Sequence, residues 1–249
     1  MQLKGKVAIV TGAATGLGKA IAERYAAEGA SVVAVDVNDA EAVVAAIQGG
    51  GGAAISLKVD VASTEDVERM AAETLARFGQ IYILVNNAAV SASLKQQAFE
   101  TIDLQEWRRV MEVNVLGVFL CIRAVAPNMR ERRAGSIINI GSGTAVKGLP
   151  RLTHYVASKA AVHTMTRSLA RELGPDNITV NAIAPGYVLT EGNLGNAEFL
   201  EAQREMAIRT RSIPRDEYAE DLTGAAVFLA GDDSRFITGQ ILSVDGGSA

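Results

Sequence analysis

The sequence predicts an α/β protein built on a doubly wound parallel sheet of about seven strands, with helices on both faces. Two observations lead to this prediction. Short β-branched runs alternate with longer helical patterns from end to end of the 249 residues. Several runs, such as KVAIVT and SVVAVD, are apolar throughout, which is typical of parallel strands covered on both faces. The strands should be joined by right-handed crossovers.

The individual elements follow from the same patterns. Strands are expected at 6–11, 31–36, 53–60, 81–87, 136–141, 178–184 and 241–245, and helices near 17–28, 64–78, 103–133, 153–174 and 216–230. The third helical pattern is expected to be two helices or one bent helix, because Pro127 interrupts it. Residues 63–66 resemble a capping box, and Gly29 and Gly174 stand where helices should stop. Four glycines at 49–52 are expected to form a mobile loop.

The whole chain, 1–249, is expected to be one domain, because neither a repeat nor a change of composition divides it. One region departs from the alternation. After the sixth strand, residues 185–215 hold a turn and a short helical pattern. An insertion at the carboxyl end of a strand is where lids over ligand sites usually lie, so a substrate lid is expected there.

Composition and charge exclude several classes. A net charge of −4 and a pI of about 5.4 argue against nucleic-acid binding, which favours a strong basic patch. No stretch is expected to approach the ~20 apolar residues of a membrane helix, and the start lacks a signal-peptide pattern. A single cysteine, Cys121, suits the reducing cytoplasm. A metal site is not expected, because His154 and His163 would point to opposite sides of one helix.

A glycine-rich stretch, TGAATGLG at 11–18, follows the first strand and opens the first helix. Its glycines allow a tight turn and a close approach of the backbone to a pyrophosphate, which the helix N-terminus attracts. A glycine-rich turn without a ligand is the alternative. The strand before, the helix after and an acidic residue at the end of the second strand favour a Rossmann-type nucleotide site.

That acidic residue, Asp36, also bears on the choice of nucleotide. Its carboxylate can accept hydrogen bonds from both ribose hydroxyls and would repel a 2′-phosphate. Residues 14–15 and 37–38 are uncharged, so NAD is expected rather than NADP. A strand-end aspartate that only caps a turn is the alternative. Asp60 and Val61, after the third strand, could reach the adenine or form merely another turn.

Further motifs in the same order resemble the short-chain dehydrogenase/reductase family, over nearly the whole chain. They are TGxxxGxG at 11–18, NNAA at 86–89, Asn114 in MEVNVLGVF, Ser142 after the fifth strand, Tyr155 and Lys159 as YxxxK, PGxxxT at 185–190, and the ending GQILSVDGG. Ala89 departs from the family's usual glycine. A methyl group should be tolerated there if the backbone does not need a positive φ.

The resemblance implies NAD(H)-dependent hydride transfer between a hydroxyl and a carbonyl group. It implies that Asn87 and Lys159 contact the nicotinamide ribose, and that Val188 and Thr190 hold the carboxamide or the phosphates. It also implies a homotetramer built through helices 103–133 and 153–174 and the last strand, although these helices could simply be core. The expected cofactor-binding residues are Gly12, Thr15, Gly16, Leu17, Gly18, Asp36, Asp60, Val61, Asn87, Tyr155, Lys159, Val188 and Thr190.

Alcohol oxidation needs a base, and the stretch HYVASK offers two. Lys159 lies four residues after Tyr155, so both share a helix face. An ammonium about 6 Å from the phenol would favour phenolate by roughly 3 kcal/mol at an effective dielectric near 20, and the helix N-terminus adds to this. His154 has a suitable ordinary pKa but should point about 100° away from Tyr155. Its neighbour Ser158 suggests a Ser–His dyad, yet the sequence places no acidic residue to orient the imidazole.

Two further polar residues complete the expected catalytic set. Ser142 follows the fifth strand, where its hydroxyl could hydrogen-bond the substrate oxygen, or be a plain turn serine. Asn114 stands among apolar residues of a helix and needs a polar partner. The family role is to hold a water on a proton path from Lys159, and a purely structural asparagine is the alternative.

The expected function is therefore interconversion of a secondary alcohol and a ketone, with Tyr155 as general acid and base. A fairly apolar substrate pocket is expected from Val90, Leu94, Val146, Leu149, Tyr187, Leu189, Leu194 and Phe199. Alternatives are a 3-oxoacyl-carrier-protein reductase, which could use Arg130, Arg132, Arg133 and Arg171 against an acidic carrier, and a sugar or polyol dehydrogenase. An NAD-binding protein without turnover is a further alternative, against which the intact Ser142, Tyr155 and Lys159 argue.

Overall fold

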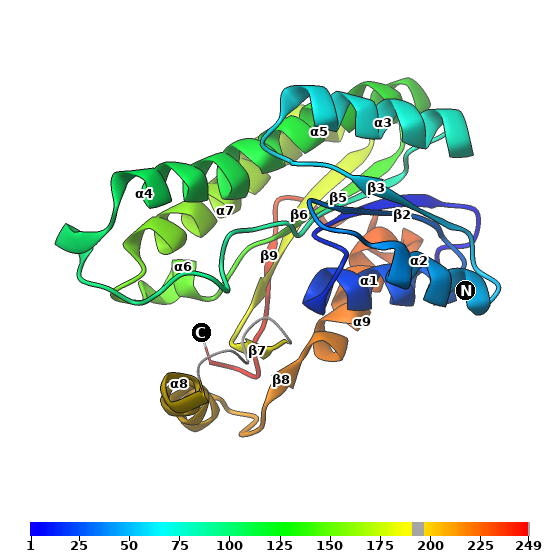
Figure 1. Cartoon of the computed structure of the whole chain (residues 1–249). Coiled ribbons are helices and arrows are strands. Elements are labelled where there is room, and N and C mark those ends of the chain that lie inside the picture. Colours follow the sequence, from blue (N-terminus) through cyan, green and yellow to red (C-terminus); the bar gives the residue numbers. More distant parts are fainter. Residues whose placement is uncertain (191–196, 249) are drawn as a thin grey trace.

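A computed structural model describes residues 1–190 and 197–248, without the side chains of 197–200, 202 and 203. Seven parallel strands form the main sheet in the order β3-β2-β1-β4-β5-β6-β9 (Figure 1). The strands are β1 Val7–Thr11, β2 Ser31–Asp36, β3 Ala54–Lys58, β4 Ile83–Asn86, β5 Gly135–Ile140, β6 Ile178–Pro185 and β9 Ile241–Val244. The order reverses between β1 and β4, so the crevice for a ligand lies beyond the carboxyl ends of these strands. The predicted Rossmann-type fold is confirmed.

Helices cover both faces of the sheet, as Figure 1 shows. The helices of one face are α1 Gly16–Ala27, α2 Glu41–Gly49 and α9 Ala219–Ala230, and those of the other are α3 Thr64–Phe78, α5 Gly117–Arg132 and α7 Thr153–Leu173. Alternate residues of the strands β1 to β6 enter two separate apolar clusters. In β2, Val32 and Ala34 join the first cluster, whereas Val33 and Val35 join the second. This alternation explains why the strands are apolar throughout.

The predicted elements agree with the structure except at a few positions. Ser63 caps α3 by accepting the N–H of Asp66, and Gly29 follows α1 with a φ of 90°. Helices α2 and α6, Thr144–Lys147, were not among the predicted helices, and 217–218 form a strand instead of starting α9. Short turns of 3-10 helix lie at Phe99–Thr101, Gly174–Asp176 and Asp232–Ser234 in the described part of the chain.

The long helical segment 103–133 is interrupted at a different place from the one predicted. Helix α4, Leu104–Met111, runs into a π-helical turn, Glu112–Leu116, and then into α5. Pro127 lies inside α5. The prediction that Pro127 divides the segment was wrong, because the interruption lies around Asn114. A π-helical turn of this kind is often found at functional sites.

The same segment corrects a second expectation. Residues 104–132 are long and apolar enough to meet the criterion for a membrane span, with a mean hydropathy of 1.7 in the best window. However, 56% of that window is buried inside the chain. Within the same segment, Val118, Leu120, Val125 and Met129 pack in the second apolar cluster. The hydropathy therefore reflects a core helix of the fold.

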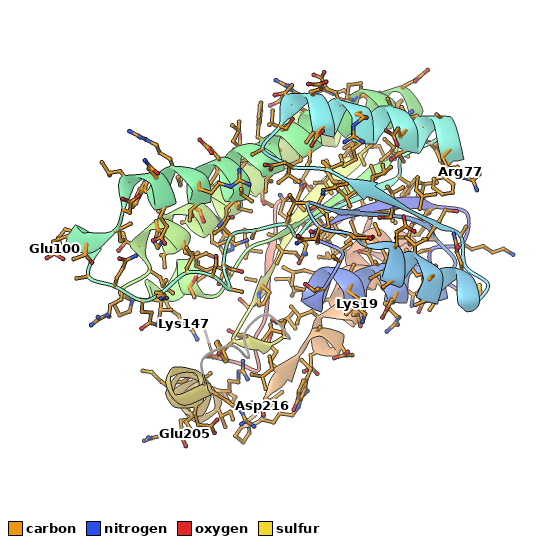
Figure 2. All side chains as sticks on the ribbon, viewed as in Figure 1. Lys19, Arg77, Glu100, Lys147, Glu205 and Asp216 are labelled. Carbon is orange, nitrogen blue, oxygen red and sulfur yellow. The ribbon has the colours of Figure 1, made fainter. Side chains whose placement is uncertain are left out.

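The insertion after β6 stands apart from the sheet (Figure 1). Strand β7, Val188–Leu189, pairs in parallel with β8, Glu217–Tyr218, and α8, Ala197–Thr210, lies between them in the chain. The turn and short helix predicted for 185–215 are thus present. Figure 2 shows charged side chains such as Lys19, Arg77 and Glu205 on the outside of the molecule.

Candidate active site

The glycine-rich turn between β1 and α1 forms a backbone cradle. Gly12 and Gly16 have φ angles of 65° and 56°, which favour glycine. A Cβ on Gly18 would lie 2.0 Å from the carbonyl oxygen of Gly12, so no other residue fits there. Thr15, at the N-cap of α1, makes no side-chain capping hydrogen bond, and the first turn has no acidic residue. The free N–H groups and close backbone fit the pyrophosphate of a dinucleotide.

Two polar side chains hold this cradle in place: Thr11 at the end of β1 and Asn87, the residue after β4. The Asn87 amide nitrogen donates to the carbonyl oxygens of Thr11 and Gly12 at 2.9 and 3.0 Å. The Thr11 hydroxyl oxygen accepts the main-chain N–H groups of Asn87 and Ala88. Both amide hydrogens of Asn87 are therefore used inside the protein, and its carbonyl oxygen is the atom that it can offer a ribose. Ala89 is not among the described non-glycine residues with positive φ, so its methyl group is accommodated as expected.

Asp36 lies at the end of β2 beside the cradle. Its carboxylate oxygens accept the N–H groups of Ala14 and Asn38 at 3.0 and 2.9 Å. Each oxygen keeps a second lone pair, so capping the turn and binding a ribose hydroxyl are compatible. Sheet register adds one residue that was not anticipated. Lys58 is paired with Asp36 across β2 and β3, and the strand alternation puts both on the face of Ala34 and Ala54.

Asp60 and Val61 lie after β3, which ends at Lys58. The Asp60 carboxylate accepts the N–H of Ala62 and pairs with Arg109 at 3.1 Å. Val61 is buried and would contact any side chain added at Gly117. These side chains therefore make the structural contacts that were considered as the alternative to adenine binding.

Helix α7 carries a polar stripe that faces the end of β5. Tyr155, Lys159 and His163 are spaced by four residues, so they lie on one face. The Lys159 Nζ lies 5.8 Å from the centre of the Tyr155 ring and donates to the carbonyl oxygen of Ile140 at 2.8 Å. One turn further, the His163 Nε2 accepts the main-chain N–H of Ser142 at 3.4 Å. The distance to the ring centre is close to the value of about 6 Å that the helix spacing suggests between ammonium and phenol.

The sequence predicts a lowered pKa for Tyr155, but in this structure the pKa is raised. Burial raises the pKa of Tyr155, and a hydrogen bond with the Ser142 side chain opposes that rise. Burial also lowers the pKa of Lys159 to about 8, because the residue as a whole is only 4% exposed. In the protein alone, burial is the largest influence on the pKa of both groups. The positive ring of an oxidised nicotinamide would act in the opposite direction on the phenol.

Ser142 is the polar group placed directly beside Tyr155. It is buried at the end of β5, where Gly141 and Gly143 donate their N–H groups to the carbonyl oxygens of Ile183 and Pro185. The Ser142 hydroxyl oxygen accepts from the Thr144 hydroxyl at 2.9 Å, and its bond with Tyr155 lowers the pKa of that phenol. The structure therefore brings the predicted pair Ser142 and Tyr155 together.

Asn114 lies in the π-helical turn and is almost completely buried. Its amide oxygen accepts the N–H of Val90, and its amide nitrogen donates to the Val90 carbonyl and to the Ser158 hydroxyl. The Ser158 hydroxyl in turn donates to the carbonyl oxygen of Tyr155. Asn114 thus joins the segment after β4 to the catalytic turn of α7, which is the structural alternative considered above.

His154 faces away from Tyr155, as the helix geometry predicts. Its ring is fully buried and stacks on Trp107, with ring centres 6.4 Å apart. The expectation that no acidic residue lies beside the His154 imidazole was wrong, because Glu106 of α4 lies 3.2 Å from His154 Nε2. Glu106 also accepts a hydrogen bond from Gln97. Ser158 is bonded to Asn114 and to the backbone, so a Ser–His dyad is not formed.

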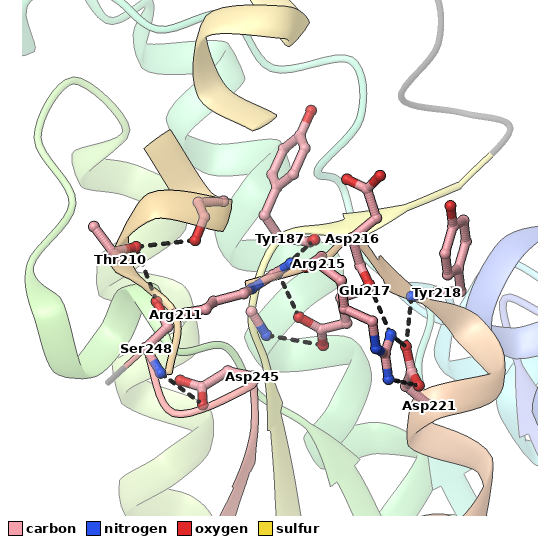
Figure 3. A network of polar contacts seen from close by, with 12 residues as sticks. Tyr187, Thr210, Arg211, Arg215, Asp216, Glu217, Tyr218, Asp221, Asp245 and Ser248 are labelled. Atoms are coloured by element: carbon pink, nitrogen blue, oxygen red, sulfur yellow. Dashed lines mark hydrogen bonds and ion pairs between the residues drawn. The ribbon is translucent and has the colours of Figure 1, made fainter. Parts of the chain in front are cut away.

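The insertion is fastened to the fold by a buried ion pair, shown in Figure 3. Arg211 donates to Glu217 at 2.7 Å and to the carbonyl oxygen of Tyr187 at 2.8 Å. Glu217 also accepts the N–H of Gly186 at 3.2 Å. Burial raises the pKa of Glu217, and the Arg211 guanidinium opposes that rise.

This ion pair fixes the segment that carries two expected cofactor contacts. Val188 lies in β7, and Thr190 lies beside the glycine-rich turn, because a Cβ on Gly16 would be 3.4 Å from the Thr190 side chain. The base of the insertion therefore meets the cradle.

The expected pocket residues have different surroundings. Val90 packs against the second apolar cluster, and Val146 is 62% exposed. Tyr187 is half-buried, and burial raises its pKa. Leu194 and the side chain of Phe199 lie outside the described residues. Within the described chain, no three His, Cys, Asp or Glu side chains are grouped to hold a metal ion.

Comparisons with known proteins agree with this geometry. Residues 12–249 match the profile of a family described as Enoyl-(Acyl carrier protein) reductase. The 3-oxoacyl-[acyl-carrier-protein] reductase FabG of Staphylococcus epidermidis is 37% identical over 247 residues, covering 97% of this chain and 98% of its own.

Two solved structures are also similar over almost the whole chain. A levodione reductase has a TM-score of 0.93 at 31% identity, covering 98% of this chain and 97% of its own. A candidate NAD(P)-dependent gluconate 5-dehydrogenase from Beutenbergia cavernae, described with NADP bound at low occupancy, has a TM-score of 0.91 at 37% identity. This second comparison covers 99% of this chain and 98% of that structure.

Proposed function

The chain belongs to the short-chain dehydrogenase/reductase family, and from that premise we propose that it interconverts a secondary alcohol and a ketone with NAD(H). The observation that supports this most is the contact of Ser142 with Tyr155, with Lys159 one helical turn away. Bound NAD(H) would accept or deliver the hydride at the carbon that carries the substrate oxygen. The glycine cradle, Asp36, Asn87 and Thr190 would hold it.

The proton at the substrate oxygen is assigned to Tyr155. In the oxidative direction the phenolate form takes the alcohol proton, and in the reductive direction the phenol donates it. Ser142, which already bonds the phenol, would orient the substrate oxygen and stabilise charge on it. Lys159 would stabilise the phenolate through its ammonium, which is held by Ile140 at the end of β5.

The choice of NAD over NADP rests on the Asp36 carboxylate beside the glycine cradle. A 2′-phosphate would meet this negative charge at close range. Lys58, its neighbour across the sheet, is the residue that could offset the repulsion, so the two side chains act in opposite senses. The relative described with bound NADP makes this choice worth measuring directly.

The test is a screen in which the purified chain is given NAD⁺ or NADP⁺ with a panel of secondary alcohols, and the reduced cofactor is followed by absorbance. The panel should include cyclic, aromatic and acyclic alcohols, polyols, sugar acids such as gluconate, and 3-hydroxyacyl thioesters. Turnover with simple secondary alcohols and a preference for NAD⁺ support the proposal. Turnover confined to 3-hydroxyacyl thioesters with NADP⁺ contradicts the choice of NAD(H) and favours the second candidate below, and no turnover with any of these alcohols contradicts the proposed reaction.

A 3-oxoacyl-carrier-protein reductase is the second candidate, because a FabG relative is similar over nearly the whole chain. Two of the arginines considered for binding an acidic carrier already lie near acidic residues of this chain. Arg130 pairs with Asp176 and Glu172, and Arg133 lies near Asp176. These residues lie at the amino end of β5, whereas Tyr155 lies at the carboxyl end. A carrier bound there would have to reach the active site of another subunit.

Assembly and location complete the proposal. Large apolar side chains are exposed on the α4–α5 segment and near the C-terminal strand, namely Leu104, Leu116, Phe119, Phe228, Phe236 and Leu242. We expect these surfaces to be covered in a homotetramer in the cytoplasm. Light scattering of the purified chain tests this, and a monomer at micromolar concentration contradicts it. A small-molecule substrate remains the expected partner, without nucleic acid or membrane.

A further inference from the structure

His163 is a buried polar side chain to which the proposed mechanism gives no part. It lies on α7, four residues after Lys159, and is 7% exposed. Its Nε2 atom is the acceptor of the main-chain N–H of Ser142, a contact between residues 21 positions apart. The neighbouring N–H groups of Gly141 and Gly143 are already bonded to β6. The imidazole thus satisfies the one buried donor at this strand end that β6 does not reach.

The ring is also fitted to the backbone that it contacts. A Cβ on Gly141 would lie 2.2 Å from His163 Nε2 and 2.6 Å from its Cδ2. Gly141 is not among the residues with positive φ, so its conformation alone would allow a side chain. The glycine is therefore needed because the imidazole occupies that space. The His163 ring therefore packs against Gly141 and also accepts the N–H of Ser142, so both contacts fix the end of β5.

We propose that His163 is a positioning residue for Ser142: its neutral imidazole accepts the Ser142 N–H and holds the Ser142 hydroxyl against Tyr155. This inference rests on the role given to Ser142 in the proposed function. Because Nε2 accepts, the ring hydrogen must lie on Nδ1. Protonation of Nε2 would place two donors opposite each other and release Ser142.

The charges around His163 favour the neutral ring. Burial lowers the pKa of His163, and the positive charges of Arg167 and Lys159 lower it further. Both cations lie on α7 itself, as does the titratable phenol of Tyr155. Strand β5 presents Gly141 and Ser142 to the ring, and β6, with the sequence ITVNAIAP, has no titratable side chain. The described surroundings therefore oppose the imidazolium form.

The first test reads the ring directly and does not depend on turnover. The chain has only two histidines, so long-range ¹H–¹⁵N spectra of the labelled full-length protein can be assigned by comparison with a His154→Ala variant. We expect an Nδ1–H tautomer at neutral pH and loss of that signal pattern in Gly141→Ala, which displaces the ring. A proton on Nε2 at neutral pH overturns the proposal, whatever the substrate is.

The second test separates positioning from folding. His163→Leu removes the acceptor and should lower kcat about tenfold, with the cofactor dissociation constant unchanged within about twofold. His163→Gln offers an amide oxygen that does not titrate, so kcat should recover and its decline at acidic pH should weaken. Gly141→Ala should resemble His163→Leu. A His163→Leu variant with normal kcat, or a glutamine variant no better than leucine, contradicts the proposal.

A Ser142→Ala variant measured in parallel distinguishes the two inferences. Normal turnover in Ser142→Ala would contradict the role of Ser142 in the proposed function. The tautomer and the Gly141→Ala spectrum would still decide whether His163 holds the Ser142 backbone.

Discussion

The ammonium of Lys159 donates a hydrogen bond to the carbonyl oxygen of Ile140 at 2.8 Å. The side chain that is proposed to act on Tyr155 therefore also ties α7 to the end of β5. Burial of Lys159 disfavours its charged form and lowers the pKa of the side chain from the ordinary 10.5 to about 8. A charged lysine in this place is costly for the folded protein.

Lys159→Met should remove this cost and nearly all turnover at once. At neutral pH both folded and unfolded wild-type chains carry the charge, so the variant should gain up to about 3 kcal/mol in free energy of unfolding. Between about pH 8 and 10.5 the unfolded wild type binds the proton that the folded form has lost. Wild-type stability should therefore rise with pH in that window, and the difference should shrink. Denaturant unfolding of the cofactor-free proteins at several pH values measures it, and a less stable variant at neutral pH contradicts the argument.

Tyr155→Phe should abolish turnover and leave cofactor binding intact. The substitution removes the hydroxyl that bonds the Ser142 side chain, without changing the shape of the ring. A loss of at least about a thousandfold in kcat is expected, with the cofactor dissociation constant measured by fluorescence. Rates near those of the wild type would remove Tyr155 from the mechanism.

Asp36 and Lys58 should shift the cofactor preference in opposite directions. Asp36→Ala removes the carboxylate that would repel a 2′-phosphate, so NAD should bind more weakly and NADP more tightly. Lys58→Ala, the matched variant across the sheet, should reduce any residual NADP binding. Titration of both cofactors onto each variant is the measurement. If neither variant changes the ratio of the two dissociation constants, another residue selects the nucleotide.

Glu217→Ala should loosen the base of the insertion. It leaves Arg211 buried without its carboxylate, and removal of one partner of a buried pair commonly costs about 3–5 kcal/mol. Glu217→Gln keeps an acceptor for Arg211 and Gly186, so it should lose less. Thermal unfolding and limited proteolysis near residues 197–210 compare the two. Equal behaviour of both variants would show that the ion pair does not hold the segment.

His154→Ala should lower stability more than activity. The ring fills a fully buried site against Trp107, and its loss should cost about 2 kcal/mol or more. Turnover below the unfolding temperature should stay within a fewfold of the wild type. Glu106→Gln, which removes the charge beside the ring, is the control. A loss as large as that of Tyr155→Phe would instead identify His154 as the base.

The sequence by itself determined the seven strands of the main sheet, helices α1, α3, α7 and α9, the glycine cradle and the pair Tyr155 and Lys159. These features depend on local geometry: the period of apolar residues, the freedom of glycine at 12 and 16, and a spacing of four on a helix. Helix geometry also predicted correctly that His154 points away from Tyr155. Such inferences use only residues that are neighbours in the chain or on one element.

Only the tertiary structure decided how separate elements meet. It placed the helix interruption at Asn114 rather than Pro127, because the Asn114 side chain bonds Val90, 24 positions away. It paired Lys58 with Asp36 and brought the His163 ring against Gly141 and Ser142. It also showed that burial raises the pKa of Tyr155, since desolvation depends on everything packed around the phenol rather than on the spacing of two residues.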